Sequence, residues 1–266
     1  MRGSRVIRVV LDGLQKVELH SLSRPPVKPT EEPTGELINW GAQVYVYSVI
    51  AHIRTVLKGL VQVADSENIP VAFIIVRHVF EWAAHAAYMS RSLRVFYKQK
   101  QWKEAWELLT ASATGNRWIK RYGSKYAPVG ATWAFDDTPD PIHISKVMTA
   151  LERHEQETFG LEDAKDTYGH LSEHSHPNSA CLQQYHRWDT DGRALNFCDP
   201  APSSSPLSSA SRALIALLMC FHDLLAMSRE SSVRQQLKSL LEEIAKLAPK
   251  KNATSQSHTA SHSEEQ

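Results

Sequence analysis

The run from Val71 to Met89 constrains the fold of this chain more than any other segment. It is almost continuously apolar and long enough to cross a bilayer, yet it carries Arg77, His78, Glu81 and His85. Ionisable side chains are costly inside a membrane. A helix that is apolar nearly all round also suits the middle of a helical bundle. We therefore expect a buried helix at the centre of a soluble bundle.

The composition agrees with a single helical domain. The chain has 266 residues, of which 42% are hydrophobic and only 11 are glycine. This length and apolar content suffice for a sizeable core, and scarce glycine argues against a sheet-rich fold with many tight turns. The fold class we predict is all-α, a single helical bundle of six to eight helices, with one small β-hairpin as an optional addition.

Cysteine usage and the N-terminus bear on the compartment. The three cysteines are odd in number and show no CxxC spacing, which is typical of a reducing cytosol rather than of a disulfide scaffold. Residues 1–22 lack the uninterrupted apolar stretch of a signal peptide. These observations predict a cytoplasmic protein, and the ionisable residues between Val71 and Met89 predict that it makes no contact with a membrane.

Proline and low-complexity segments set the expected boundaries. The Arg24–Pro29 stretch and Pro33 exclude a helix there, so residues 1–34 are expected to form an N-terminal arm. Residues 35–248 are assigned to the helical bundle domain. Residues 249–266 lack large apolar side chains and are predicted to be a disordered tail.

Apolar residues spaced three and four apart predict the individual helices. They are expected over Glu36 to Ala64, Pro70 to Lys98, Gln101 to Ser112, Asn116 to Tyr122, Ile142 to Phe159, Leu161 to His174, Ser208 to Ser228 and Ser231 to Leu247. The segment from Cys181 to Phe197 is the candidate hairpin, because Asp189 to Gly192 contains an Asp-Gly turn signal.

The ionisable residues of the central helix form the first polar cluster. Arg77, Glu81 and His85 follow one another at i, i+4 and i+8 and therefore share one face. A buried charge must be paired, because an unpaired one is strongly destabilising. Two interpretations stay open: an intrahelical Arg77–Glu81 pair that fixes the helix register, or one wall of an active or binding site.

A second polar cluster runs from Tyr168 to Asn178. His170 and His174 are one turn apart, and with Glu173 they match the H-x-x-E-H pattern of inverzincin peptidases. The strands and distant acidic ligand of that class are not evident, so we predict no metal site and no cofactor. The alternative is a helix end, where histidines interact favourably with the helix dipole and Pro177 stops the helix.

Taken together, these motifs resemble a known family. An Arg-x-x-x-Glu on an apolar helix (Arg77, Glu81) precedes a Tyr-x-x-Leu-Ser-x-x-x-His-Pro run from Tyr168 to Pro177. This order resembles the bacterial all-α proteins catalogued as domain of unknown function 5677, over roughly residues 39–228. The family is similar in outline to the HEPN helical bundles, many of which are metal-independent ribonucleases or partners of toxin and defence systems.

The nuclease signature of the HEPN bundles is missing from this chain. That signature is an arginine, four to six further residues and then a histidine, and no histidine here has an arginine five to seven positions before it. The resemblance therefore implies a non-catalytic or rearranged site rather than the usual HEPN ribonuclease site.

Charge is distributed unevenly along the chain. Residues 91–126 contain nine Lys/Arg against two Glu, and residues 136–173 contain ten Asp/Glu against three Lys/Arg. Cations that alternate with aromatic rings suit single-stranded nucleic acid. The candidate nucleic-acid-binding residues are Arg94, Lys98, Trp102, Arg117, Lys120 and Arg121. Alternatively, the aromatic rings pack inward and the cations form a solvated face opposite the acidic segment.

Two functions from different classes follow. The first is a HEPN-like module that acts through a macromolecular partner, a single-stranded nucleic acid or a protein, in bacterial defence or stress. The second is a metal-independent nuclease or other hydrolase. In that alternative Arg77 holds a phosphate, His174 or His176 is the general acid/base, and Glu81 orients one of them. Asn178 completes the candidate catalytic set.

The two functions differ in the geometry that they require. An enzyme needs Arg77 or Glu81 within hydrogen-bond reach of residues 170–178 and beside an open pocket. A structural role predicts that the same groups are paired and sealed from solvent. A homodimer through helices is expected only by analogy with other bundles.

Overall fold

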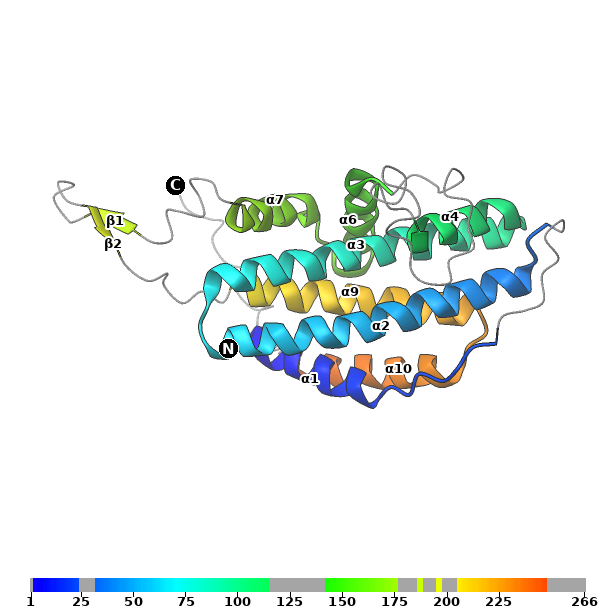
Figure 1. Ribbon diagram of the computed structural model, residues 1–266, viewed down its shortest axis with the longest axis horizontal. Coiled ribbons are helices and arrows are strands. Elements are labelled where there is room, and N and C mark those ends of the chain that lie inside the picture. Colours follow the sequence, from blue (N-terminus) through cyan, green and yellow to red (C-terminus); the bar gives the residue numbers. More distant parts are fainter. Residues whose placement is uncertain are drawn as a thin grey trace, which may run out of the picture.

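The computed structural model describes residues 2–23, 32–114, 142–176, 186–188, 195–197 and 205–247. Within them the chain forms eight helices and two short strands (Figure 1). The elements are α1 (Arg2–Lys16), α2 (Gly35–Asp65), α3 (Ile69–Gln99), α4 (Trp102–Thr114), α6 (Ile144–Phe159), α7 (Ala164–Ser175), β1 (His186–Trp188), β2 (Leu195–Phe197), α9 (Ser205–Met227) and α10 (Ser232–Ala245). The all-α helical bundle predicted from the sequence is confirmed.

Helix α3 is the centre of the bundle. The Asn68 side chain accepts a hydrogen bond from the Val71 N–H, and Pro70 lies in the first turn, so the local sequence starts the helix where it is seen. At the other end Lys100 adopts a left-handed conformation with φ of 56°, which terminates the helix. Helix α3 packs against α2, α4, α6, α7 and α9 (Figure 1). The sequence prediction of a central helix over Pro70 to Lys98 agrees with these bounds.

The N-terminal segment differs from its prediction. Within the expected arm of residues 1–34, Arg2–Lys16 forms α1, which packs against α2, α9 and α10. The buried side chains Ile7, Val10 and Leu14 recur at helical spacing. Arg54 of α2 donates from Nε to the Leu14 carbonyl oxygen over 2.8 Å, which satisfies a carbonyl at the C-terminal end of α1. The prolines that exclude a helix lie further along the chain and do not affect this segment.

If α1 is an integral part of the bundle, a small deletion in its buried face must destabilise the whole protein. We expect Val10→Ala to lower the free energy of unfolding by roughly 2 kcal/mol, because the Val10 side chain is fully buried. Gln15→Ala on the exposed face of α1 is the control and should change it by less than about 0.5 kcal/mol. Urea denaturation followed by far-UV circular dichroism measures both. Equal stability of Val10→Ala and the parent protein would mean that α1 behaves as a loose arm.

The length and apolar composition of three helices contradict the predicted cellular location. Among the described residues, α2, α3 and the Pro206–Met227 part of α9 are long and apolar enough to cross a membrane by length and composition. This finding contradicts the predictions of a cytoplasmic location and of no membrane contact. Among these three helices, only the ionisable residues of α3 were used as a reason against a membrane. The interior of a large bundle and a bilayer both select long apolar helices, so the charges of one helix do not decide between them.

Strands β1 and β2 pair antiparallel, with His186 opposite Phe197. Several other expectations lie outside the described residues. These are the short helix from Asn116 to Tyr122, the turn at Asp189 to Gly192 and the disordered tail over residues 249–266.

Candidate functional site

The two polar clusters of the sequence meet where α7 lies along α3 (Figure 1). Arg77 and Glu81 are one turn apart on α3, so both side chains leave the same face of that helix. Tyr168 lies on α7, and His176 is the residue that caps its C-terminal end. The packing of α3 against α7 brings these four side chains together. We call them the Arg77 cluster.

The Arg77 guanidinium is the hub of this cluster. Nη1 lies 3.0 Å from His176 Nε2, and Nη2 donates to the Tyr168 hydroxyl over 3.2 Å. Nε forms an ion pair with Glu81 Oε1 at 3.2 Å. The Tyr168 hydroxyl in turn donates to the same Glu81 oxygen over 2.9 Å. Each side chain therefore orients another, and the guanidinium is held in a fixed position.

The Arg77 cluster is open to solvent and remains charged. The Arg77 and Glu81 side chains are 25% and 33% exposed, and His176 is exposed. Burial lowers the pKa of Arg77, but the hydrogen bond and charge of Tyr168 and the charge of Glu81 outweigh it, so the pKa is raised overall. Because a guanidinium only donates, His176 Nε2 must accept, which requires a neutral imidazole protonated at Nδ1.

His174 occupies a different environment from His176. Its ring stacks on Phe73 with 4.6 Å between centroids, and His170 lies 4.4 Å away in an edge-on arrangement. Burial, followed by the charge of His170, lowers the pKa of His174. Among the described residues there is no group of three or more His, Cys, Asp or Glu side chains placed to hold a metal. The histidine with a ring nitrogen facing Arg77 is His176, and Asn178 lies outside the described residues.

His85 was predicted to share one helix face with Arg77 and Glu81, but it faces α2 instead of α7. Its Nδ1 lies 2.9 Å from the hydroxyl of Tyr45, a buried residue of α2. Burial lowers the pKa of His85 to about 4. The imidazole is therefore neutral near pH 7 and serves as a hydrogen-bond partner in the seam between α2 and α3.

Sequence reasoning missed a histidine pair in the same seam. His52 Nε2 on α2 lies 2.8 Å from His78 Nε2 on α3, and the Trp82 indole N–H donates to His78 Nε2 over 3.1 Å. His78 was visible on the apolar helix. His52 carried no signal, because only the packing of α2 against α3 places it next to His78.

The structure describes three of the six predicted nucleic-acid-binding residues, and two of these three contact other residues of the protein. Arg94 forms an ion pair with Asp223. Trp102 packs edge-on against Tyr97 with 5.1 Å between ring centroids, and Lys98 is exposed. Arg117, Lys120 and Arg121 lie outside the described residues. Where the structure describes this segment, its aromatic rings pack against the core and its cations lie at the surface.

A buried ion pair between α6 and α9 was not anticipated. Glu155 is completely buried, and its Oε1 lies 3.1 Å from Arg212 Nε. The other guanidinium nitrogens donate to Asp163 over 2.8 Å and to the Thr167 hydroxyl over 3.0 Å. Burial raises the pKa of Glu155 to about 7, although Arg212 opposes this shift. From sequence, Glu155 looks like one acid among many, and only its position against α9 sets it apart.

The Arg77 cluster is thus the described site in which a cation, an imidazole, a phenol and a carboxylate converge near solvent. The family resemblance stays a prediction, because no family model, no curated protein and no solved structure matches this chain.

Proposed function

We propose that this protein is a metal-independent phosphodiester hydrolase, a nuclease of single-stranded RNA, that acts at the Arg77 cluster. One observation carries the proposal: the Arg77 guanidinium is hydrogen-bonded to the neutral His176 imidazole on a partly exposed face. A fixed cation next to a proton acceptor is the minimum that phosphoryl transfer needs when no metal takes part.

In this proposal each residue of the Arg77 cluster has a defined role. Arg77 binds the phosphate oxygens and stabilises the charge that develops on them. Once Arg77 Nη1 donates to the phosphate instead of to His176, the freed His176 Nε2 takes the proton from the ribose 2′-hydroxyl as that oxygen bonds to phosphorus. The bond from phosphorus to the 5′-oxygen breaks, and that oxygen takes up a proton from water, which leaves a 2′,3′-cyclic phosphate and a 5′-hydroxyl. The Tyr168 hydroxyl, which accepts from Arg77 and donates to Glu81, positions the guanidinium together with Glu81.

The Arg77 cluster meets one of the two requirements set for an enzyme, because Arg77 is within hydrogen-bond reach of His176. Two cavities lined by described residues, of about 400 and 420 Å³, include none of its four side chains, so neither provides the expected open pocket. Binding across an open face suits a single strand, whose phosphates are accessible without a deep pocket.

A second candidate is a HEPN-like module that acts through a macromolecular partner in bacterial defence or stress. It is favoured by the internal pairing of Arg77, whose guanidinium nitrogens already contact Glu81, Tyr168 and His176. In this case the Arg77 cluster holds α7 against α3, and a partner recognises the surface that α7 presents.

Cleavage of labelled single-stranded RNA in EDTA tests the nuclease. Arg77→Ala and His176→Ala are each expected to lower the rate about 100-fold, because they remove charge stabilisation and proton transfer. Tyr168→Phe is expected to lower it about tenfold, because it removes the hydroxyl that accepts from Arg77 and donates to Glu81 and so leaves the guanidinium less well positioned. The controls are Arg8→Ala, which breaks an exposed ion pair with Asp65, and His143→Asn, which keeps an acceptor at the start of α6. Both should keep the parental rate.

The assay also separates the two candidates. A parent protein that cleaves no RNA, while it still binds RNA or a protein partner, supports the module and rejects the nuclease. Cleavage that survives both Arg77→Ala and His176→Ala would place any active site elsewhere. Thermal unfolding of each variant checks that a lost rate does not come from a lost fold.

A further inference from the structure

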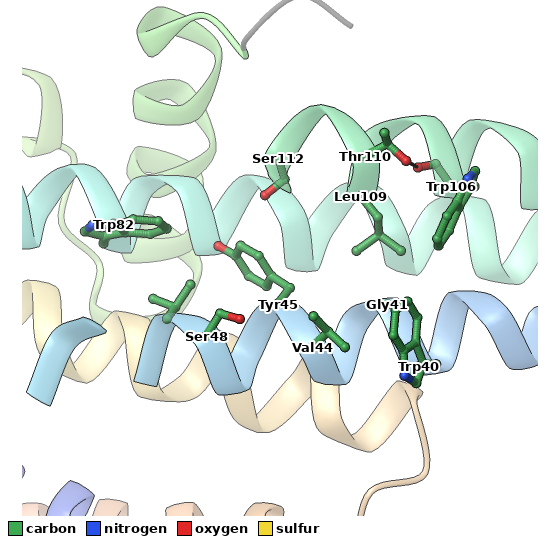
Figure 2. Close-up of a pocket in the computed structure, with 11 residues that line it drawn as sticks. Trp40, Gly41, Val44, Tyr45, Ser48, Trp82, Trp106, Leu109, Thr110 and Ser112 are labelled. Atoms are coloured by element: carbon green, nitrogen blue, oxygen red, sulfur yellow. Dashed lines mark hydrogen bonds between the residues drawn. The ribbon is translucent and has the colours of Figure 1, made fainter. Parts of the chain in front are cut away.

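A second site lies on another side of α3, in a cavity of about 400 Å³ between α2, α3 and α4 (Figure 2). Figure 2 shows Trp82 at one end, Trp40 and Trp106 at the other, and Tyr45 between them. No residue of the Arg77 cluster lines it. Aromatic rings at both ends provide a large apolar contact area for a bound molecule.

The cavity is elongated along α2. Trp40 and Ser48 both line it and are eight positions apart on that helix. At 1.5 Å per residue this separation spans ~12 Å. An extended chain of about ten carbons has a similar length, given single bonds of ~1.5 Å. The dimensions therefore suit a narrow, medium-length chain.

The cavity wall carries no charge. None of its lining residues is acidic, basic or histidine, and its polar groups are hydroxyls and indoles. The hydroxyl of Thr110 donates to the Trp106 carbonyl oxygen over 2.8 Å. Tyr45 is held by His85, and burial raises the pKa of Tyr45 well above its ordinary value, so the phenol stays neutral. A charged ligand group drawn into the cavity beside the buried Tyr45 would lose its hydration without gaining a counter-charge, although Ser48 itself is exposed.

Gly41 allows α4 to approach α2 closely beside the cavity. A Cβ at Gly41 would lie 2.9 Å from Leu109 Cδ1 and 3.5 Å from the Trp106 ring. Glycine inside a helix costs about 1 kcal/mol of stability relative to alanine. The close approach of α4 explains why a glycine is present here in spite of that cost. The Leu109 and Trp106 side chains are thereby held against α2 as one wall of the cavity.

We propose that this cavity binds one uncharged, elongated aliphatic molecule of about ten carbons, such as a medium-chain alcohol, with its polar end near Ser48 and Ser112. Both serine side chains lie near Tyr45, on opposite sides of its ring in Figure 2. The aliphatic chain packs against Val44 and Leu109 toward the Trp40 and Trp106 end. The site is independent of the nuclease proposal.

Calorimetric titration of the full chain with 1-decanol and with decanoate at pH 8 tests the ligand class. The two probes share one chain length and differ in the charge of the polar end. We expect one molecule of decanol to bind per chain, and decanoate to bind at least about tenfold more weakly because its carboxylate is not compensated. Equal binding of the two, or no binding of decanol up to its solubility limit, would overturn the proposal.

Two substitutions that fill the cavity test whether decanol binds there. Ser48→Phe and Ser112→Phe place a ring into the cavity from α2 and from α4, and each is expected to weaken decanol binding at least about tenfold by occupying its volume. Ala51→Phe is the matched control on the exposed surface of α2, outside the cavity, and should leave the affinity within about twofold. Decanol affinity that is unchanged in both folded filled variants would show that decanol binds elsewhere. Circular dichroism identifies the folded variants.

Discussion

Replacing Arg212 with methionine is expected to lower the free energy of unfolding by about 4 kcal/mol. Arg212 is the ion-pair partner of Glu155, a residue with 0% of its side chain exposed, at 3.1 Å. Removal of the guanidinium leaves a carboxyl group in an apolar interior with no opposite charge, which costs far more than the ion pair itself contributes. Urea denaturation at pH 8, where Glu155 would otherwise be ionised, measures the loss.

The matched double variant reveals the origin of this loss. Arg212→Met combined with Glu155→Leu removes both charges, and we expect it to recover at least about 2 kcal/mol relative to Arg212→Met alone. Arg94→Met is the control, because its ion pair with Asp223 is 53% and 40% exposed. That substitution should cost less than about 1 kcal/mol. A double variant as unstable as Arg212→Met would show that the arginine stabilises by packing, for example over the Phe80 ring.

The pH dependence of stability should change in opposite directions when Glu155 and His85 are replaced separately. Burial raises the pKa of Glu155 from 4.5 to about 7, so the folded state retains a proton that the unfolded state has lost between these values. Glu155 therefore makes the protein less stable as the pH rises from about 4.5 to 7, by about 3 kcal/mol at most. Glu155→Gln should remove this decrease.

His85 has the opposite effect. Burial lowers its pKa from 6.5 to about 4, so the unfolded state binds a proton that the folded state does not bind between these values. His85 therefore makes the protein less stable as the pH falls from about 6.5 to 4, by about 3 kcal/mol at most. His85→Gln should remove this loss while it keeps an acceptor for the Tyr45 hydroxyl.

Denaturation of both variants and the parent at pH 4.5, 5.5 and 7 measures the two slopes. The difference between each variant and the parent isolates one group, because the other titrating histidines contribute equally to both proteins. Relative to the parent, stability should increase more steeply with pH in Glu155→Gln and less steeply in His85→Gln. Parallel curves for all three proteins would mean that neither group titrates differently in the folded state.

Local sequence predicted the central helix and named Arg77, Glu81 and His176 among the candidate catalytic residues, whereas Tyr168 was named only as part of the second polar cluster. Asn68 and Pro70 start α3, and the spacing of Arg77 and Glu81 places them on one face, because helix geometry depends on neighbours along the chain. The motif from Tyr168 to His176 was also recognisable as a polar cluster on a separate helix. The sequence could not show that α7 packs on α3 with Tyr168 between Arg77 and Glu81.

Other features had weaker sequence signals or none. The helical spacing of Ile7, Val10 and Leu14 was present, but the prolines that follow it favoured an arm. His52 and Glu155 are unremarkable in the sequence, and only contacts from α3 and α9 give each its partner. The prediction of no membrane contact was wrong. Hydropathy describes how apolar a helix is, but it does not identify whether protein or lipid surrounds that helix.

By itself, the amino-acid sequence determined the all-α class, the bounds of the central helix and the shared face of Arg77 and Glu81. These properties depend on interactions within a few turns of one helix. The tertiary structure alone decided which histidine meets Arg77, which carboxylate is buried with Arg212, and that residues of α2, α3 and α4 line one uncharged cavity. These properties depend on the packing of helices that are distant in sequence, where the environment of a side chain is set by residues that no local pattern specifies.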